Sequence, residues 1–486
     1  MRIDSLIELT RSSLKLGIYA FAAVLLFYLA GYLFLYRKYL FGKKRISPLY
    51  FLWLMIMCWY LAVIINVTLA GRGEVYSYRI APLFSSYREA WYNASVTEWR
   101  NIILNYCLFI PLGILLPLGI RFFRKMYRVG AAALILTLSI EIIQVLRKSG
   151  IFEFDDILGN VIGALIGYGF FGIALYIYSR KKSVEIPLRR IIGLQIPLFL
   201  LIIAYVSLIL VYNIKTLGNN SYGFYYGYDP ESLTVSSEIN LDDKEKTIPL
   251  YKAPVLTPDE AVEFAYEISG RLGSGGYKKT KDVFDDYVLL RDAPDADGLI
   301  RSGSGMTDEQ HSSFCLVHYR GGIYENTIFS SAGVGISLEE GNEESQIREI
   351  LQQYGEEVPD GYDFSIWRKT KYIYEYDFVP YGEKTLYGTM AFRPQFNSYE
   401  NNVMKCDYAG DHTIISMAEA YNRITEGKFR VRSMDKNLDN IKEYRIIITG
   451  CSLIYEVDSK GYLQPDYKFT CTVNDKEKEI IIPALR

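Results

Sequence analysis

The sequence predicts a multi-domain membrane protein: an α-helical transmembrane bundle of six spans, followed by an α+β domain of helices packed on antiparallel sheet. Three observations predict this class. Residues 1–212 contain long runs of Leu, Ile, Phe and Tyr. Residues 213–486 are mixed in charge and rich in Gly, Asp, Glu and Lys. The length of 486 residues suggests two or three domains.

The overall composition excludes some functions. A net charge of −2 argues against nucleic acid as a partner, because a phosphate backbone requires a basic surface. The 42 tyrosines are expected to fill strands and interfaces rather than to form an aromatic platform for sugars.

Six apolar segments satisfy the requirement of about 20 residues for a spanning helix. They are residues 17–36, 49–69, 102–120, 129–147, 157–178 and 191–212. Lys and Arg are concentrated in the links after the first, third and fifth segments, which predicts that these links are cytoplasmic. Both termini and the C-terminal domain are then extracytoplasmic, in a multi-pass protein of the plasma membrane.

The predicted domains follow from these segments. Residues 1–48 hold the first span and its basic loop, 49–180 a helical bundle, and 181–212 a basic loop and the sixth span. Residues 213–255 are expected to be a linker. Residues 256–486 form the extracytoplasmic domain, which could divide into 256–400 and 401–486.

Polar residues gather at one predicted level of three spans. They are Arg100, Asn101 and Asn105 at the third span, Glu141, Gln144 and Arg147 at the fourth, and Asp155, Asp156 and Asn160 at the fifth. The third and fifth spans start outside and the fourth ends there, so these groups should meet in the outer leaflet. Ionisable groups at membrane depth usually face the bundle interior or a watery cavity. The cluster is therefore either a polar clasp that joins three helices or a pocket for a charged or hydroxylated headgroup.

Small residues and prolines predict tight packing around this cluster. Gly159, Gly163 and Gly167 form two small-xxx-small steps, which allow close approach of a neighbouring helix. Pro111 and Pro117 each remove a backbone hydrogen bond within the third span. Neighbouring groups must then satisfy the freed carbonyls.

Four short motifs resemble the VanZ-like family over residues 50–178. They are "APLFSSY" at 81–87, "NYCLFIPLGILLPLG" at 105–119, "IEIIQ" at 140–144 and "FDDILGNVIGALIGY" at 154–168. The resemblance implies a role in the cell envelope, since the family takes its name from a protein linked to teicoplanin resistance. The chain departs from the family pattern at Arg79, where members often have Asn, and at Ile151, where many have a basic residue.

The C-terminal region shows three helix starts, at Thr257, near 343 and at Ser416, each followed by strand-like runs. Hairpins are expected about Gly321–Gly322 and Gly382. Residues 416–486 resemble the extracytoplasmic YycI/YycH or PepSY-type modules, which implies binding of peptides or regulation of a sensor kinase. Four cysteines (Cys315, Cys406, Cys451 and Cys471) allow three pairings. Cys451–Cys471 is the preferred one, since these residues lie on neighbouring predicted strands.

Three functional hypotheses follow. In the first, a non-enzymatic membrane protein binds a membrane lipid or a lipid-linked envelope precursor, with Arg100 on phosphate and the acids on hydroxyl or cationic groups. In the second, an intramembrane enzyme acts on polyprenyl-phosphate or phospholipid, with Asp155 and Asp156 holding a divalent cation and Glu141 as general base. In the third, the outer domain restrains a sensor kinase. No cofactor and no resident metal are expected, because no metal-ligand spacing occurs in the sequence.

Overall fold

The computed structural model describes residues 47–69, 80–148, 150–182, 186–225, 227–271, 279–284, 286–292, 314–327, 336–367, 370–396, 398–432 and 443–486. The chain divides into two compact units, which are described separately. Unit 1 comprises Met1–Lys215 and Ser433–Glu443, and unit 2 comprises Thr216–Arg432 and Tyr444–Arg486.

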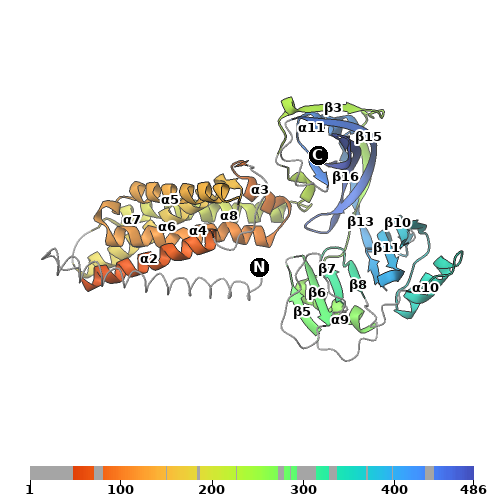
Figure 1. Cartoon of the computed structure of the whole chain (residues 1–486), viewed down its shortest axis with the longest axis horizontal. Helices are drawn as coiled ribbons and strands as arrows, with labels where there is room; N and C mark the ends of the chain where they lie inside the picture. The colour runs from red at the N-terminus through yellow and green to blue at the C-terminus, as the bar shows by residue number, and fades with distance from the viewer. Residues whose placement is uncertain are drawn as a thin grey trace. The chain divides into compact units, whose positions relative to one another are not determined.

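Unit 1 is helical (Figure 1). Its helices are α2 (Pro48–Leu69), α3 (Ser85–Tyr92), α4 (Val96–Gly119), α5 (Met126–Leu146), α6 (Phe154–Lys181), α7 (Leu188–Leu194) and α8 (Ile196–Ile214). Within the described residues, α2, α4, α5, α6 and α8 are long and apolar enough to cross a membrane. Five of the six predicted spans are confirmed as such helices, and the span predicted at 17–36 lies outside the described residues.

The closest helix contact in unit 1 joins α4 and α6, which run parallel. A Cβ added at Gly163 would lie 2.1 Å from the Tyr106 carbonyl oxygen, and one at Gly167 would lie 2.0 Å from that of Ile110. Gly113 of α4 meets the Ala164 carbonyl of α6 in the same way, at 2.0 Å. The predicted small-residue steps are therefore confirmed, and they bring the backbones themselves into contact.

Helix α2 supports the proline-containing α4 with hydrogen bonds. Trp53 Nε1 donates to the Leu115 carbonyl at 2.8 Å, and the Tyr60 hydroxyl donates to the Leu108 carbonyl at 2.8 Å. Both acceptors lie close to the positions that Pro111 and Pro117 disturb. A polar group in apolar surroundings requires a hydrogen-bond partner. These two hydrogen bonds therefore hold α2 against α4.

Unit 2 is built on sheet. Its strands are β3 (Leu233–Ser237), β4 (Lys246–Lys252), β5 (Lys279–Val283), β6 (Tyr287–Asp292), β7 (Phe314–His318), β8 (Tyr324–Thr327), β9 (Asp363–Trp367), β10 (Lys371–Tyr381), β11 (Lys384–Arg393), β12 (Ser398–Asn401), β13 (Met404–Ile414), β14 (Arg430–Arg432), β15 (Tyr444–Val457), β16 (Tyr462–Val473) and β17 (Lys476–Pro483). Its helices are α9 (Pro258–Arg271), α10 (Glu343–Gln353) and α11 (Met417–Thr425).

The strands form one branched, almost wholly antiparallel sheet. Its main path runs β14-β17-β16-β4-β13-β11-β12-β8-β7-β6-β5. The long strand β13 joins its two halves, since it pairs with β11 through Met404–Cys406 and with β4 from Asp407 onward. Residues 213–255 were predicted as a linker, but they contribute β3 and β4 to this sheet. That prediction is wrong because both strands pair with segments far along the chain, which local patterning does not reveal.

Helices and turns of unit 2 follow the predicted signals. Thr257 and Glu260 form a capping box at the start of α9, and Ser416 Oγ accepts from the Glu419 backbone N–H at 3.1 Å at the start of α11. Gly321 and Gly322 have φ of 81° and 61°, which a tight hairpin turn requires. In Figure 1, α9 lies beside β5–β8 and α10 beside β10 and β11.

Tyrosines make up much of the core beneath α9 and α10. Tyr374, Tyr376 and Tyr399 are among the largest fully buried side chains. The hydroxyls of Tyr324 and Tyr399 donate to the buried Glu356 carboxylate at 2.6 and 3.1 Å. Tyrosine thus acts here as strand and core filler with a satisfied polar tip.

The preferred disulfide between Cys451 and Cys471 is not formed, because all six cysteines are free thiols. Cys451 lies opposite Phe469, whereas Cys471 lies opposite Ile448. The two residues are therefore on paired strands but not in register with each other. The sequence pattern predicted correctly that the two strands are neighbours, but it did not predict their register.

The α4–α6 contact leads to a first prediction. Gly163→Ala should lower the thermal stability of the detergent-solubilised protein clearly, since overpacking against backbone typically costs about 1–3 kcal/mol. Gly193→Ala on α7 is the matched control, because nothing lies within 4 Å of its added Cβ. Equal melting temperatures for the two variants would contradict the close approach of α4 and α6.

Candidate functional site

One end of the helical bundle carries a polar cluster. The C-terminal ends of α2 and α5 and the N-terminal ends of α4 and α6 lie there. A short parallel pairing of β1 (Ile80–Ala81) with β2 (Phe152–Glu153) ties the segment before α3 to the start of α6. The strands bring backbone groups of two loops to the side chains at the helix ends.

Asp155 holds the start of α3. Its carboxylate is 3% exposed and accepts from the backbone N–H groups of Phe84 at 2.6 Å and Ser86 at 2.8 Å. Phe84 has φ of 66°, a left-handed conformation that is unfavourable for a bulky residue. A negative charge at a helix N-terminus is stabilising, so Asp155 both caps α3 and holds Phe84 in this conformation.

Asp156 faces a different helix. Its carboxylate accepts from the Asn105 amide of α4 at 2.5 Å, and both side chains are half-buried. Arg100 is also half-buried, and it lies on α4 between one and two turns before Asn105. A carboxylate, an amide and a guanidinium are thus present near the N-terminal ends of α4 and α6.

Glu141 and Asn160 are buried more completely than Asp156. Glu141 is 2% exposed and accepts from the Glu153 backbone N–H at 3.0 Å. The Asn160 amide donates to the Thr137 hydroxyl at 2.9 Å, while its buried Oδ1 has no hydrogen-bond partner within the described residues. Acids and amides of α5 and α6 are therefore packed inside the bundle rather than against acyl chains.

Three of the predicted site residues lie outside this arrangement. Gln144 donates to the Thr68 carbonyl at 2.9 Å and Arg147 to the Leu69 carbonyl at 3.3 Å, so both bind the C-terminal end of α2. A cation suits that position, because the last carbonyls of a helix carry partial negative charge. Asn101 is exposed on α4, and its side chain makes no hydrogen bond to any part of the chain that the structure describes.

The two neighbouring aspartates do not act as a pair. Asp155 binds backbone N–H groups at the start of α3, and Asp156 binds Asn105. Successive residues of a helix project about 100° apart, which separates their partners. Among the described residues no group of three or more His, Cys, Asp or Glu side chains could hold a metal ion.

The sequence reasoning missed the backbone donors of Phe84, Ser86 and Glu153, and also Thr137. Thr137 was recognisable, because it precedes Glu141 by one helical turn on the same face. The backbone donors gave no signal, since any residue type supplies an N–H group.

Unit 2 also buries carboxylates. Asp458 accepts from the Gly218, Lys460 and Tyr462 backbone N–H groups at 2.6, 2.7 and 3.0 Å. Asp466 is fully buried and accepts from the Asn220 amide at 2.8 Å. Burial raises the pKa of the Asp466 carboxyl to about 8. These two acids fix residues 218–220, near the beginning of unit 2, against β16 and the turn that precedes it.

Loss of the Asp155 carboxylate should loosen α3. Asp155→Ala removes the acceptor of two N–H groups, and an unsatisfied buried group costs about 1–3 kcal/mol. We expect faster tryptic cleavage at Arg88 and a lower melting temperature. Asp155→Asn keeps one acceptor oxygen and should show a smaller change. Unchanged cleavage in Asp155→Ala would contradict the capping role.

The raised pKa of Asp466 predicts a pH dependence. The folded state keeps the proton up to pH about 8, whereas the unfolded state loses it near the ordinary aspartate pKa of 3.8. The free energy of unfolding should therefore fall as pH rises between these values, by at most about 1.4 kcal/mol per pH unit. Asp466→Asn should remove this part of the dependence in urea unfolding at several pH values. Parallel curves for both proteins would contradict it.

Comparison with known proteins assigns the helical region. Residues 47–176 match the family model described as VanZ/LLP1. Protein VanZ of Enterococcus faecium is 34% identical over 112 residues, which is 22% of this chain and 64% of that protein. The chain thus spans just under two thirds of the curated relative that it matches. The comparisons give no support to the resemblance of residues 416–486 to YycI/YycH or PepSY-type modules. They show a VanZ-like domain at residues 47–176, and this range contains the whole polar cluster.

Proposed function

We propose that this chain is an integral membrane protein of the cell envelope whose VanZ-like domain binds the phosphate-bearing headgroup of a lipid or lipid-linked precursor. We further propose that it contributes to resistance against glycopeptides of the teicoplanin type. The observation that carries the proposal is the half-buried Asn105–Asp156 pair at the N-terminal ends of α4 and α6, with the half-buried Arg100 between one and two turns before Asn105 on α4. The E. faecium relative and the five spans support the membrane and envelope setting.

The cluster divides into a scaffold and a binding part. Glu141 and Asp155 are almost fully buried and accept backbone N–H groups, so they serve the packing of the bundle. Arg100, Asn105 and Asp156 are only half-buried, although Asp156 directly follows Asp155 on α6. The clasp and the pocket are then neighbouring groups within one arrangement.

The binding part suits a phosphate ester that carries hydroxyl groups. A guanidinium forms short, charge-assisted hydrogen bonds with phosphate oxygens. Asp156 orients the Asn105 amide, whose second N–H group and Oδ1 make no other hydrogen bond among the described residues and could bind the ligand. The predicted orientation places this end of the bundle at the outer leaflet, where a headgroup reaches it without crossing the membrane.

The intramembrane enzyme has less support. A cation between Asp155 and Asp156 requires both carboxylates to face one point, but their hydrogen-bond partners lie on α3 and α4, respectively. Glu141 accepts a backbone N–H group and is almost fully buried, which suits a structural acceptor better than a general base that exchanges protons with a substrate.

This function predicts that Asn105→Ala weakens glycopeptide resistance and headgroup binding together. A host that depends on this chain should become several-fold more sensitive to teicoplanin. Lipid co-purified with the variant, measured by mass spectrometry, should fall in parallel.

Asn101→Ala is the matched control, since it removes an amide side chain of the same type from the same helix, one turn away, at an exposed position. It should keep both properties. Equal loss in Asn101→Ala and Asn105→Ala, or unchanged lipid in Asn105→Ala, would contradict a specific site at Asn105.

A further inference from the structure

The end of the helical bundle opposite the polar cluster carries a basic surface, called the basic rim below. The rim comprises the link between α4 and α5 and the start of α7, and its cations are Arg121, Arg124, Lys125, Arg128, Arg189 and Arg190. In Figure 1, α7 lies at the far end of the bundle from α3. Arg128 is half-buried and the other cations of the rim are exposed.

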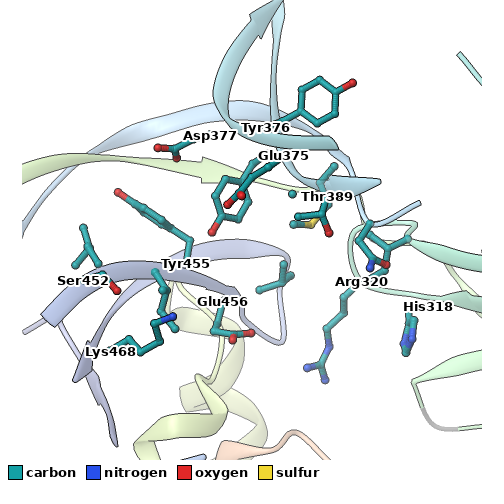
Figure 2. Close-up of a pocket in the computed structure, with 18 of the residues that line it drawn as sticks. His318, Arg320, Glu375, Tyr376, Asp377, Thr389, Ser452, Tyr455, Glu456 and Lys468 are labelled. Atoms are coloured by element: carbon teal, nitrogen blue, oxygen red, sulfur yellow. The ribbon is translucent and has the colours of Figure 1, made fainter. Parts of the chain in front are cut away.

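The charge of the basic rim is not compensated by the described part of the bundle. The acids that the structure describes between residues 102 and 215 all lie at the polar-cluster end, and they are Glu141, Glu153, Asp155 and Asp156. Cations of unit 2 have a different setting. Figure 2 shows Arg320 and Lys468 in a cleft that carboxylates also line, and Lys468 pairs with Glu479 at 3.5 Å. The rim therefore suits a negative charge supplied from outside the bundle.

Two hydrogen bonds hold both parts of the rim at one level of α6. The Tyr168 hydroxyl donates to the Arg124 carbonyl at 2.6 Å, which fixes the link between α4 and α5. Gln195 Nε2, directly after α7, donates to the Gly169 carbonyl at 3.0 Å. The Arg190 guanidinium is also close enough to Tyr168 to act on it electrostatically. Cations from segments more than 60 residues apart in the sequence therefore border the same place, as Arg124 and Arg190 show.

Aromatic groups hold Arg128 in a fixed position. Its guanidinium lies 4.2 Å from the centre of the Phe122 ring. Nη1 donates to the Phe122 carbonyl at 3.0 Å, and Nε donates to the Tyr127 hydroxyl at 3.2 Å. Nη2 makes no hydrogen bond to the part of the chain that the structure describes. A cation that is already held on a ring loses little conformational freedom when it binds an anion.

Exposed apolar side chains lie among these cations. Phe122 is 58% exposed and Tyr127 is 64% exposed, and Leu188 and Ile192 of α7 are exposed as well. Aromatic residues at the ends of spanning helices usually lie at the level of the lipid headgroups, and clustered Lys and Arg there attract acidic lipids. A lipid places its phosphate beside the cations and its acyl chains beside the rings, whereas a free anion would leave the rings in water. The rim therefore fits an acidic lipid better than a soluble anion.

We propose that the basic rim binds the headgroup of an acidic phospholipid between the α4–α5 link and α7. The guanidinium groups of Arg124, Arg128 and Arg190 supply charge-assisted hydrogen bonds to the phosphate. The rings of Phe122 and Tyr127 pack against the upper part of the acyl chains. This site is separate from the one proposed around Asn105, since the two lie at opposite ends of the bundle.

The test uses the full-length protein in detergent, titrated with phosphatidylglycerol or with phosphatidylcholine of the same acyl chains and followed by native mass spectrometry. Phosphatidylglycerol should bind saturably and at least tenfold more tightly than phosphatidylcholine. The double variant Arg124→Gln/Arg190→Gln should lose this preference, and both side chains are exposed, so the fold should remain. Equal binding of the two lipids, or an unchanged preference in the double variant, would overturn the proposal.

Two controls separate a specific site from general attraction between charges. Arg88→Gln/Lys148→Gln removes the same number of exposed cations from the other end of the bundle and should keep the preference for phosphatidylglycerol. Inorganic phosphate in excess should not displace the bound lipid, because it offers nothing to the exposed rings. Equal losses in the two double variants, or displacement by phosphate, would contradict a lipid site at the rim.

The ring beneath Arg128 gives an independent readout. Phe122→Ala should weaken phosphatidylglycerol binding several-fold, whereas Phe122→Tyr keeps a ring and should bind normally. Unchanged binding in Phe122→Ala would show that the ring does not position Arg128 for the lipid. Asn105→Ala, which tests the function proposed for the other end of the bundle, should keep the preference for phosphatidylglycerol. Loss of the preference in Asn105→Ala alone would assign this lipid to the polar cluster and overturn the site at the rim, so either proposal can fail alone.

Discussion

The contact on which unit 1 depends is the meeting of the α4 and α6 backbones at Gly113, Gly163 and Gly167. No side chain separates the two helix backbones at these glycines. The contacts therefore fix the position of α4 along α6. This position places Asn105 beside Asp156 and brings the Asn105 Cβ within 3.5 Å of a Cβ built at Gly159. The polar cluster is therefore a consequence of packing: without the glycines, the carboxylate of α6 would lie a side chain's width further from its amide partner.

Much of this was predictable from the sequence, for physical reasons. Five spans follow from apolar length alone, and the level of Glu141, Asp156 and Asn160 follows from counting turns along helices of alternating direction. The glycine spacing of α6 predicted a close neighbour but could not identify α4. Asp155 shows the limit most clearly. Two consecutive aspartates suggested a carboxylate pair, but successive side chains of a helix point to different neighbours. The partners of Asp155 are backbone N–H groups, which any residue type can supply.

Unit 2 shows a different limit. Its helix caps and hairpin turns are local, and Thr257, Ser416 and Gly382 predicted them correctly. The pairing of β3 with β15 joins segments more than 200 residues apart, as Leu233↔Tyr444 shows. The strands of Cys451 and Cys471 were correctly predicted to be neighbours. Their register was not predicted correctly, so the expected disulfide is not formed. Non-local pairing depends on the whole sheet, so no short window of sequence contains it.

The carboxylates of the two units lie in opposite environments, buried in unit 1 and exposed at Asp363 and Glu375 in unit 2. In unit 1 the buried carboxylates of Glu141 and Asp155 receive backbone N–H groups, because an unsatisfied charge at membrane depth is too costly to keep. In unit 2, Asp363 and Glu375 oppose each other as exposed cross-strand partners, where water and salt keep their repulsion small. Two like charges can therefore lie side by side at this exposed position. In the apolar surroundings of the bundle, the buried carboxylates are instead held by backbone N–H groups of the chain itself.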